Sequence, residues 1–189
     1  TVGFATKLGL APVHNWLPDA HSEAPAPVSA LLSGALLNTA FLALVRVYKI
    51  ALCAGVGRYA SLLLFTMGFL SLFVSAVFIL RTREYKRMLA YSSIEHMGIL
   101  AIGLASGGAG IAAAFLHMIG HSLGKTAFFL TAGGVYERFE VKSMRKLQGL
   151  VHAAPALGWL WLAAFTAGCA FPPFVTFFSE LAIARELLA

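Results

Sequence analysis

The sequence is poor in charge, and this shortage is the first constraint on the class of protein. Only 12% of the 189 residues are Asp, Glu, Lys or Arg, while 59% are hydrophobic. An average soluble protein carries about 25% charged residues. The mean hydropathy of the chain is +0.81. This composition argues against an ordinary soluble domain and predicts a membrane protein.

Cysteine is also scarce. Cys53 and Cys169 lie far apart in apolar segments and form no CxxC pair or other metal-ligand spacing. We therefore expect neither an iron–sulfur cluster nor a structural zinc site, and no cofactor in this chain. The formal charge of +6 does not predict nucleic-acid binding, because the basic residues gather between apolar runs.

The sequence contains several long runs without charged residues. The run from Ser61 to Leu80 would form a helix of roughly 30 Å, about one hydrocarbon thickness. Strands of a β-barrel would alternate over about ten residues, and these runs do not. We therefore predict an all-α, polytopic transmembrane helix bundle that forms a single transmembrane domain over residues 1–189. We expect six spans, at Thr1–Asp19, Pro27–Ile50, Tyr59–Leu80, Met88–Ala105, Ala109–Gly134 and Pro155–Leu188.

Prolines interrupt the first and the last of these spans. Pro12 and Pro18 disturb the first, and the pair Pro172 and Pro173 in "FPPF" breaks the sixth. Proline has no backbone donor, and it forces the preceding residue out of the helical region. Discontinuous helices of this kind are where transporters place ion sites.

Basic residues mark one end of the bundle. Two spans separate two basic segments, so both lie on the same side: Arg81, Arg83, Lys86 and Arg87, then Arg138, Lys142, Arg145 and Lys146. The connection between the second and third spans, on the opposite side, has only Arg46, Lys49 and Arg58. Positively charged connections stay in the cytoplasm. We therefore expect a multi-pass protein of the cytoplasmic (inner) membrane with the two richer segments inside.

Three ionisable residues recur at steps of four in "HMIGHSLGK". On a helix, His117, His121 and Lys125 would form one stripe about 12 Å long. A charge near the bilayer centre costs at least roughly 2.5 kcal/mol, so such groups usually face a hydrated interior or a partner. Imidazole titrates near neutral pH and can donate and accept. We interpret the stripe as a proton relay. The alternative is that the histidines bond to nearby backbone and Lys125 reaches an interface.

Histidines in membrane helices also suggest haem. Two histidines four positions apart on one helix cannot ligate opposite faces of one iron, and His96 is the only other deep candidate that we identify. We therefore do not expect haem.

Four further polar residues lie within or beside apolar runs. Lys7 precedes Pro12, and Glu180 follows the proline pair in "FPPFVTFFSE". Each is either a protonatable group beside a helix break or a charge at a surface end of its span. Glu95 and His96, in "YSSIEHMG", either line a polar path or pair locally.

Three long stretches resemble one family. "KLGLAPVHNWLPDAHSEAPAPVSALLSG", "KRMLAYSSIEHMGIL" and "HMIGHSLGKTAFFLTAGGVYE" are similar to the proton-conducting antiporter-like subunits of NADH:quinone oxidoreductase, multisubunit sodium/proton antiporters and membrane-bound hydrogenases. The resemblance covers essentially the whole chain. "ALLNTAFLALVR", the acidic "SSIEHMG" and "PPFVTFFSE" look most like the hydrogenase-4 component F group and its formate hydrogenlyase relatives.

The resemblance implies a unit of about fourteen helices with two inverted repeats, each with a broken helix and a buried lysine. This chain would be a fragment that holds the end of the first repeat and most of the second. Asn38 stands near a position where several relatives have lysine or histidine, so the link between the half-channels departs from the family's pattern. The implied relay consists of Lys7 on the first broken helix, the connecting His117 and His121, the central Lys125 and the exit residue Glu180.

We therefore expect a proton-translocating, non-redox membrane subunit of a hydrogenase-4 or formate hydrogenlyase-type complex. Its partners would be other membrane subunits, peripheral redox subunits and the lipid bilayer. The alternatives are a subunit of a multisubunit sodium/proton antiporter and a subunit of NADH:quinone oxidoreductase.

Overall fold

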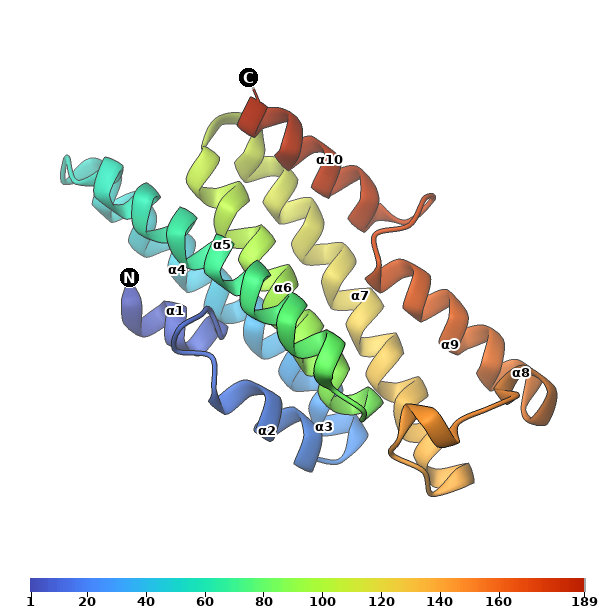
Figure 1. The fold of residues 1–189 in the computed structure, drawn as a ribbon. Coiled ribbons are helices and arrows are strands. Elements are labelled where there is room, and N and C mark those ends of the chain that lie inside the picture. Colours follow the sequence, from blue (N-terminus) through green and yellow to red (C-terminus); the bar gives the residue numbers. More distant parts are fainter. Residues whose placement is uncertain (189) are drawn as a thin grey trace.

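The computed structural model describes residues 1–188, which form helices joined by short connections (Figure 1). These residues contain no strand, and a single β-bridge joins Glu84 to Ser143. The predicted all-α bundle is thereby confirmed. The helices are α1 (Val2–Leu8), α2 (Trp16–Glu23), α3 (Ala26–Leu31), α4 (Leu37–Cys53), α5 (Gly57–Arg81), α6 (Tyr85–Ser106), α7 (Gly108–Phe139), α8 (Leu150–Ala153), α9 (Pro155–Gly168) and α10 (Val175–Leu188).

Three of the described helices are long and apolar enough to cross a membrane: Ala26–Cys53, Gly57–Arg81 and Tyr85–Ser106. The first combines α3, a π-helical turn at Leu32–Leu36, and α4 in one continuous helix. The predicted second, third and fourth spans match these three helices to within a few residues.

The fifth predicted span ends too early. α7 does not stop at Gly134 but runs for 32 residues to Phe139, roughly 48 Å at the usual rise. Gly133 and Gly134 are contact points rather than stops, because Gly133 lies against Ala26 of α3 and Gly134 against Leu157 of α9. Lys125 is therefore near the middle of its helix.

The first predicted span is two helices, and its break is not at Pro18. α1 ends at Leu8, where Gly9 turns the chain with a φ of 80°, a conformation that glycine adopts without strain. Pro18 lies in the first turn of α2, where a backbone donor would have no helical acceptor in any case. α2 then continues past Asp19 to Glu23.

The sixth predicted span is broken at the proline pair, as expected. α9 ends at Gly168, α10 begins at Val175, and Pro172 and Pro173 lie between them. Figure 1 shows α9 and α10 side by side with successive parts of α7, with their connection beside the middle of the bundle.

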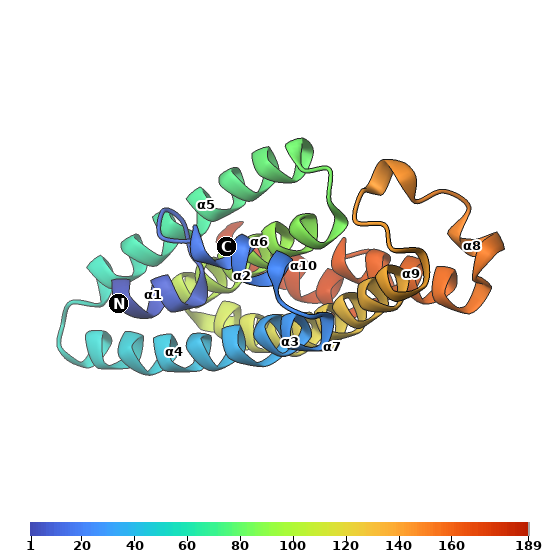
Figure 2. The same ribbon diagram turned by 90° about the horizontal axis from the view of Figure 1, so that it is seen from below.

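α6 is the central span and α5 a peripheral one. Of the most apolar stretch of α6, 72% is buried within the bundle, against 28% for α5. Figure 2 shows α6 between α5 on one side and α3 and α4 on the other. Polar groups on α6 are consequently shielded from lipid by neighbouring helices.

The two richer basic segments lie at the same end of the bundle, as predicted. The backbone N–H of Tyr85 donates to the carbonyl of Lys142 over 3.3 Å, and the N–H of Met144 donates to the carbonyl of Arg83 over 2.9 Å. That this end faces the cytoplasm stays a prediction.

Glycine allows α5 and α6 to approach closely. A Cβ at Gly98 would lie 2.8 Å from the carbonyl oxygen of Gly68, and a Cβ at Gly68 would lie 2.9 Å from that of Gly98. Between membrane helices, small residues supply packing that the hydrophobic effect cannot. The same stretch of α5 carries Ser71, whose Oγ accepts the N–H of Ala11 over 2.8 Å. This bond fixes the first helix break to α5.

We predict that Gly98→Ala lowers the free energy of unfolding by about 1–3 kcal/mol, because the new methyl group would overlap a backbone carbonyl that cannot move alone. The matched control is Gly124→Ala on α7, whose Cβ would meet only the Ala167 methyl group at 3.8 Å. The measurement is the unfolding midpoint in detergent. Equal midpoints for the two variants would contradict the close α5–α6 contact.

Candidate functional site

Two buried histidines on neighbouring helices bond to each other. His96 Nδ1 on α6 and His117 Nε2 on α7 are 2.9 Å apart. The other nitrogen of His96 lies 3.1 Å from the carbonyl oxygen of Gly168, at the end of α9. The other nitrogen of His117 lies 2.9 Å from Ser179 Oγ on α10. The pair therefore connects α6 and α7 to both sides of the second helix break.

Donor and acceptor accounting gives this network two proton states. A carbonyl only accepts, so His96 Nε2 carries the hydrogen bonded to Gly168. In a neutral pair, His117 donates to His96 and accepts from the Ser179 hydroxyl. Ser179 Oγ also lies 2.8 Å from the carbonyl of Thr176, so it can donate there and accept from His117 instead. The network can thus hold one extra proton, shared between the rings, without moving a heavy atom.

Lys125 is buried on α7 near the pair. Its side chain is 2% exposed, and its Nζ donates to the carbonyl of Leu89 over 3.3 Å and to the hydroxyl of Ser92, both on α6. Neither partner carries a charge. The alternative in which Lys125 reaches an interface is therefore wrong.

A pocket of about 460 Å³ brings together the polar residues of several elements. Glu95 and Glu180, both partly exposed, line it from α6 and α10. Glu95 and Glu180 thus line one pocket although α7, α8 and α9 lie between them in the sequence. Its other polar wall residues are Ser92, His96, Lys125 and Cys169.

His121 belongs to the predicted stripe but makes no bond within it. Its ring is 1% exposed, and among residues 1–188 neither ring nitrogen has a hydrogen-bond partner. Its centroid is 5.1 Å from that of His96. The stripe therefore lies on one buried face, but the hydrogen bonds of His117 and Lys125 cross to other helices instead of running along α7.

Two buried histidines outside the stripe were missed by the sequence analysis. His21 on α2 is fully buried, and its ring stacks on Phe129 of α7 at 5.1 Å. His14, in the first break, is 8% exposed. His96 is therefore not the only other deep histidine. The signal that could have found His21 is its spacing of four from the apolar Leu17, which places both residues on one face of the helix.

Lys7 is not buried in the described chain. Its side chain is exposed, with Nζ 5.9 Å from the centroid of the Trp16 ring. α1 packs on α4 and buries Ala5 and Leu8, which leaves Lys7 on a different face of this short helix. Its predicted burial is wrong for residues 1–188, and its predicted role stays a prediction.

Asn38 lies in α4, one turn after Gly34, and Gly34 belongs to the π-helical turn. The Gly34 carbonyl accepts from Asn38 Nδ2 over 2.7 Å and from Ser122 Oγ of α7 over 2.6 Å. Asn38 Oδ1 is buried without a hydrogen-bond partner in the described chain. π turns occur often at functional sites because they free backbone groups for other partners. This polar cluster adjoins His121 through its neighbour in sequence, Ser122.

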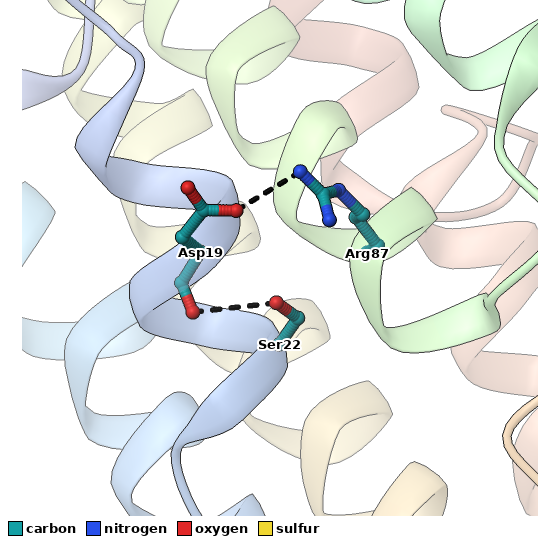
Figure 3. A network of polar contacts seen from close by, with 3 residues as sticks. All are labelled: Asp19, Ser22 and Arg87. Atoms are coloured by element: carbon teal, nitrogen blue, oxygen red, sulfur yellow. Dashed lines mark hydrogen bonds and ion pairs between the residues drawn. The ribbon is translucent and has the colours of Figure 1, made fainter.

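An ion pair joins α2 to α6 at the end of the bundle where the two richer basic segments lie (Figure 3). Arg87 donates to Asp19 over 2.9 Å, and Ser22 donates to the Asp19 carbonyl over 3.3 Å. Lys86 Nζ bonds to the carbonyl of Ala24 close by. The Arg87 and Asp19 side chains are 43% and 68% exposed, so the pair contributes at most about 1 kcal/mol. Its effect is to position α2, and with it His21.

Comparisons with known proteins agree with the fold. The family described as NADH:quinone oxidoreductase/Mrp antiporter, TM, matches residues 1–189. The chain is 42% identical over 190 residues to the hydrogenase-4 component F homolog of Methylacidiphilum infernorum, and the alignment covers 100% of this chain and 40% of that protein. The chain therefore spans well under half of the length of this relative.

Two solved structures are similar over nearly the whole chain. One is the membrane-bound sulfane sulfur reductase, an archaeal respiratory membrane complex, with a TM-score of 0.91, 28% identity, and coverage of 97% of this chain and 38% of that one. The other is respiratory complex I from Thermus thermophilus, with a TM-score of 0.88, 30% identity, and coverage of 98% and 40%.

The Lys125 contacts predict that Ser92→Ala is destabilising. Loss of the Ser92 hydroxyl leaves the buried ammonium with the Leu89 carbonyl as its one acceptor in the described chain. A hydrogen bond to a charged group contributes about 1.5–3 kcal/mol to stability. The measurement is the unfolding midpoint in detergent, with Ser92→Thr, which keeps the hydroxyl, as the control. Equal losses in both variants would mean that packing, and not the hydroxyl, matters.

Proposed function

The chain belongs to the NADH:quinone oxidoreductase/Mrp antiporter transmembrane family, and from this premise we propose that it carries a proton path through the membrane subunit of which it is part. The observation that carries the proposal is Lys125, a cationic side chain that lies near the middle of a long helix, buried among neutral acceptors and beside a pocket with two carboxylates.

Lys125 is costly to keep at this depth. A charged side chain at the bilayer centre costs at least roughly 2.5 kcal/mol, and such residues mark ion pathways and proton relays. Ser92 and Leu89 satisfy the ammonium with neutral oxygens, and within residues 1–188 no carboxylate forms an ion pair with it. Moving one charge across 100 mV takes about 2.3 kcal/mol, which is comparable with the cost of this burial.

The proposed path runs from Lys125 in two directions. On one side, the pocket leads past Glu95 and Glu180 to His96, which bonds to His117. The glutamates, being partly exposed, provide the exit. Grotthuss-type transfer suits the histidine pair, since its bonds are compatible with both proton states.

On the other side, the path passes the ring nitrogens of His121 and His21 and the side-chain oxygen of Asn38, none of which has a hydrogen-bond partner within residues 1–188. Buried polar groups find partners in protein or in ordered water, and a water molecule needs two to four of them. A water file between these groups would link the second half of the path to the first. Lys7 is the proposed protonatable group of that first half.

The complex that we propose is of the hydrogenase-4 or formate hydrogenlyase type, in the cytoplasmic membrane. Its support is the 42% identity to a protein of that name. Other membrane subunits and peripheral redox subunits would be its partners, and the redox cofactors would be bound by them. The family name also covers Mrp antiporters, so a sodium/proton antiporter subunit is the second candidate, and a quinone-oxidoreductase subunit the third.

Co-purification separates these candidates. We expect the intact subunit, extracted in mild detergent, to bring nickel–iron hydrogenase subunits with it. Sodium-dependent proton flux from a complex without redox subunits would favour the antiporter instead. Co-purification with NADH- and quinone-binding subunits would favour the third candidate.

We predict that Lys125→Ala in the intact subunit lowers proton flux roughly 100-fold or more while the complex still assembles, because a positioned proton-transfer group contributes at least this factor. The measurement is proton flux in reconstituted vesicles. The control is His152→Ala, an exposed histidine on α8, which should leave flux unchanged. Normal flux in an assembled Lys125→Ala complex would overturn the relay.

Single histidine substitutions should cost less, since water can replace one link. We expect His117→Ala to lower flux by less than the roughly 100-fold that a positioned proton-transfer group contributes, and His121→Ala to lower it by less again. His117 bonds on both sides, to His96 and to Ser179, whereas His121 bonds to no protein group in the described chain. The same vesicle assay tests this order, and a larger loss for His121→Ala would contradict the proposed path.

A further inference from the structure

We propose that His96, His117 and Glu180 form a binding site for a divalent transition-metal ion of the Zn²⁺ class. One ligand atom from each of these residues lies within 4.8 Å of the other two. The three come from α6, α7 and α10, so an ion there would join both central helices to the second half of the broken helix. This site does not depend on proton flux and goes beyond the proposed function.

The hydrogen bonds select which nitrogens face the site. His96 Nε2 donates to the Gly168 carbonyl over 3.1 Å, which leaves its Nδ1. His117 Nδ1 is engaged with Ser179 Oγ over 2.9 Å, which leaves its Nε2. These two remaining nitrogens are the ones that face each other at 2.9 Å. Metal-binding histidines almost always bond through their second nitrogen in this way, which fixes ring and tautomer.

The spacing requires a small movement of the rings and an approach of the Glu180 carboxylate by up to about 1.5 Å, since its ligand atom lies within 4.8 Å of theirs. Zinc–nitrogen bonds of 2.0–2.1 Å in a tetrahedral site separate two nitrogens by roughly 3.3 Å. The rings must therefore move apart by a few tenths of an ångström when the ion replaces the proton between them. A carboxylate oxygen of Glu180 supplies the third ligand, which gives the His₂Glu set seen in open zinc sites with water in the fourth position.

The pocket provides entry and charge balance. His96 and Glu180 line the same cavity of about 460 Å³, through which an ion and its water could enter. Glu95 lines it as well, so two carboxylates would offset the charge of a dication in an apolar environment, where an unpaired charge is costly.

The donor set decides the class of ion. Two imidazoles and one carboxylate suit Zn²⁺ and neighbouring transition ions, whereas Mg²⁺ and Ca²⁺ prefer sites made of oxygen alone. An ion bound to His96 Nδ1 and His117 Nε2 would occupy the position of their shared proton. Binding would therefore exclude the hydrogen bond between the two rings.

The test measures Zn²⁺ binding to the purified intact complex by equilibrium dialysis, with and without two substitutions. We expect one site per copy, and we expect Glu180→Gln and His96→Gln each to weaken it at least about tenfold, since even outer-shell substitutions cost 10–100-fold. The difference between wild type and variant removes the contribution of any partner subunit. His152→Ala and Cys53→Ser, at an exposed histidine and an exposed cysteine away from the pocket, are the controls, and neither should alter this site.

An affinity unchanged in both Glu180→Gln and His96→Gln would overturn the proposal, as would a loss caused by His152→Ala or Cys53→Ser. If either substitution prevents assembly, X-ray absorption at the zinc edge on wild-type protein replaces it. Nitrogen and oxygen scatterers with imidazole features are expected, and a sulfur-dominated shell would count against the site. Binding is measured without a proton gradient, so the two proposals can fail separately. If Zn²⁺ does not bind but Lys125→Ala lowers proton flux, the proposed function stands and the metal site does not. If Zn²⁺ binds as expected but Lys125→Ala leaves flux normal, the metal site stands and the proposed function does not.

Discussion

The whole arrangement depends on the cost of a polar group without a partner inside an apolar bundle. Lys125, the buried histidines and Ser93 of α6 lie where bulk water does not solvate them. Each therefore needs a hydroxyl, a carbonyl or enclosed water as its partner. This requirement brings α6 and α7 together, since their side chains serve as donors and acceptors for each other.

Irregular backbone supplies acceptors that a regular helix would use internally. The Gly168 carbonyl, at the end of α9, accepts from His96, and the Gly34 carbonyl, in the π-helical turn, accepts from Asn38 and Ser122. Gly34 is buried in its turn, whereas Phe171, Pro172 and Pro173 of the second break are exposed in the described chain. The two breaks thus supply acceptors to side chains on neighbouring helices.

The proposed proton transfer and the proposed metal binding have the same chemical basis at the second break. A site that holds a proton between two imidazole nitrogens presents the same two lone pairs to a metal ion when that proton leaves. The nearby glutamates, useful as proton acceptors, are equally useful as metal ligands. Whether a metal ion occupies the proposed site would therefore depend on which ions can reach the pocket, and not only on which ions the two imidazoles and the carboxylate can bind.

The sequence by itself determined the class of protein, the long spans, the proline break and the buried face with His117, His121 and Lys125. Hydropathy and helical periodicity act within one segment, so a single segment is enough to reveal them. Pro18, Gly133 and Gly134 misled at the boundaries, because whether such a residue ends a helix depends on its place in the turn and on its neighbours.

Only the tertiary structure decided which polar groups meet. It paired His96 with His117, set Lys125 on Ser92, buried His21 against Phe129 and left Lys7 exposed. Glu95 and Glu180, far apart in the chain, line one pocket. The physical reason is that these contacts cross between helices: they depend on the rotation and register of each helix against its neighbours, which the pattern within one helix does not contain.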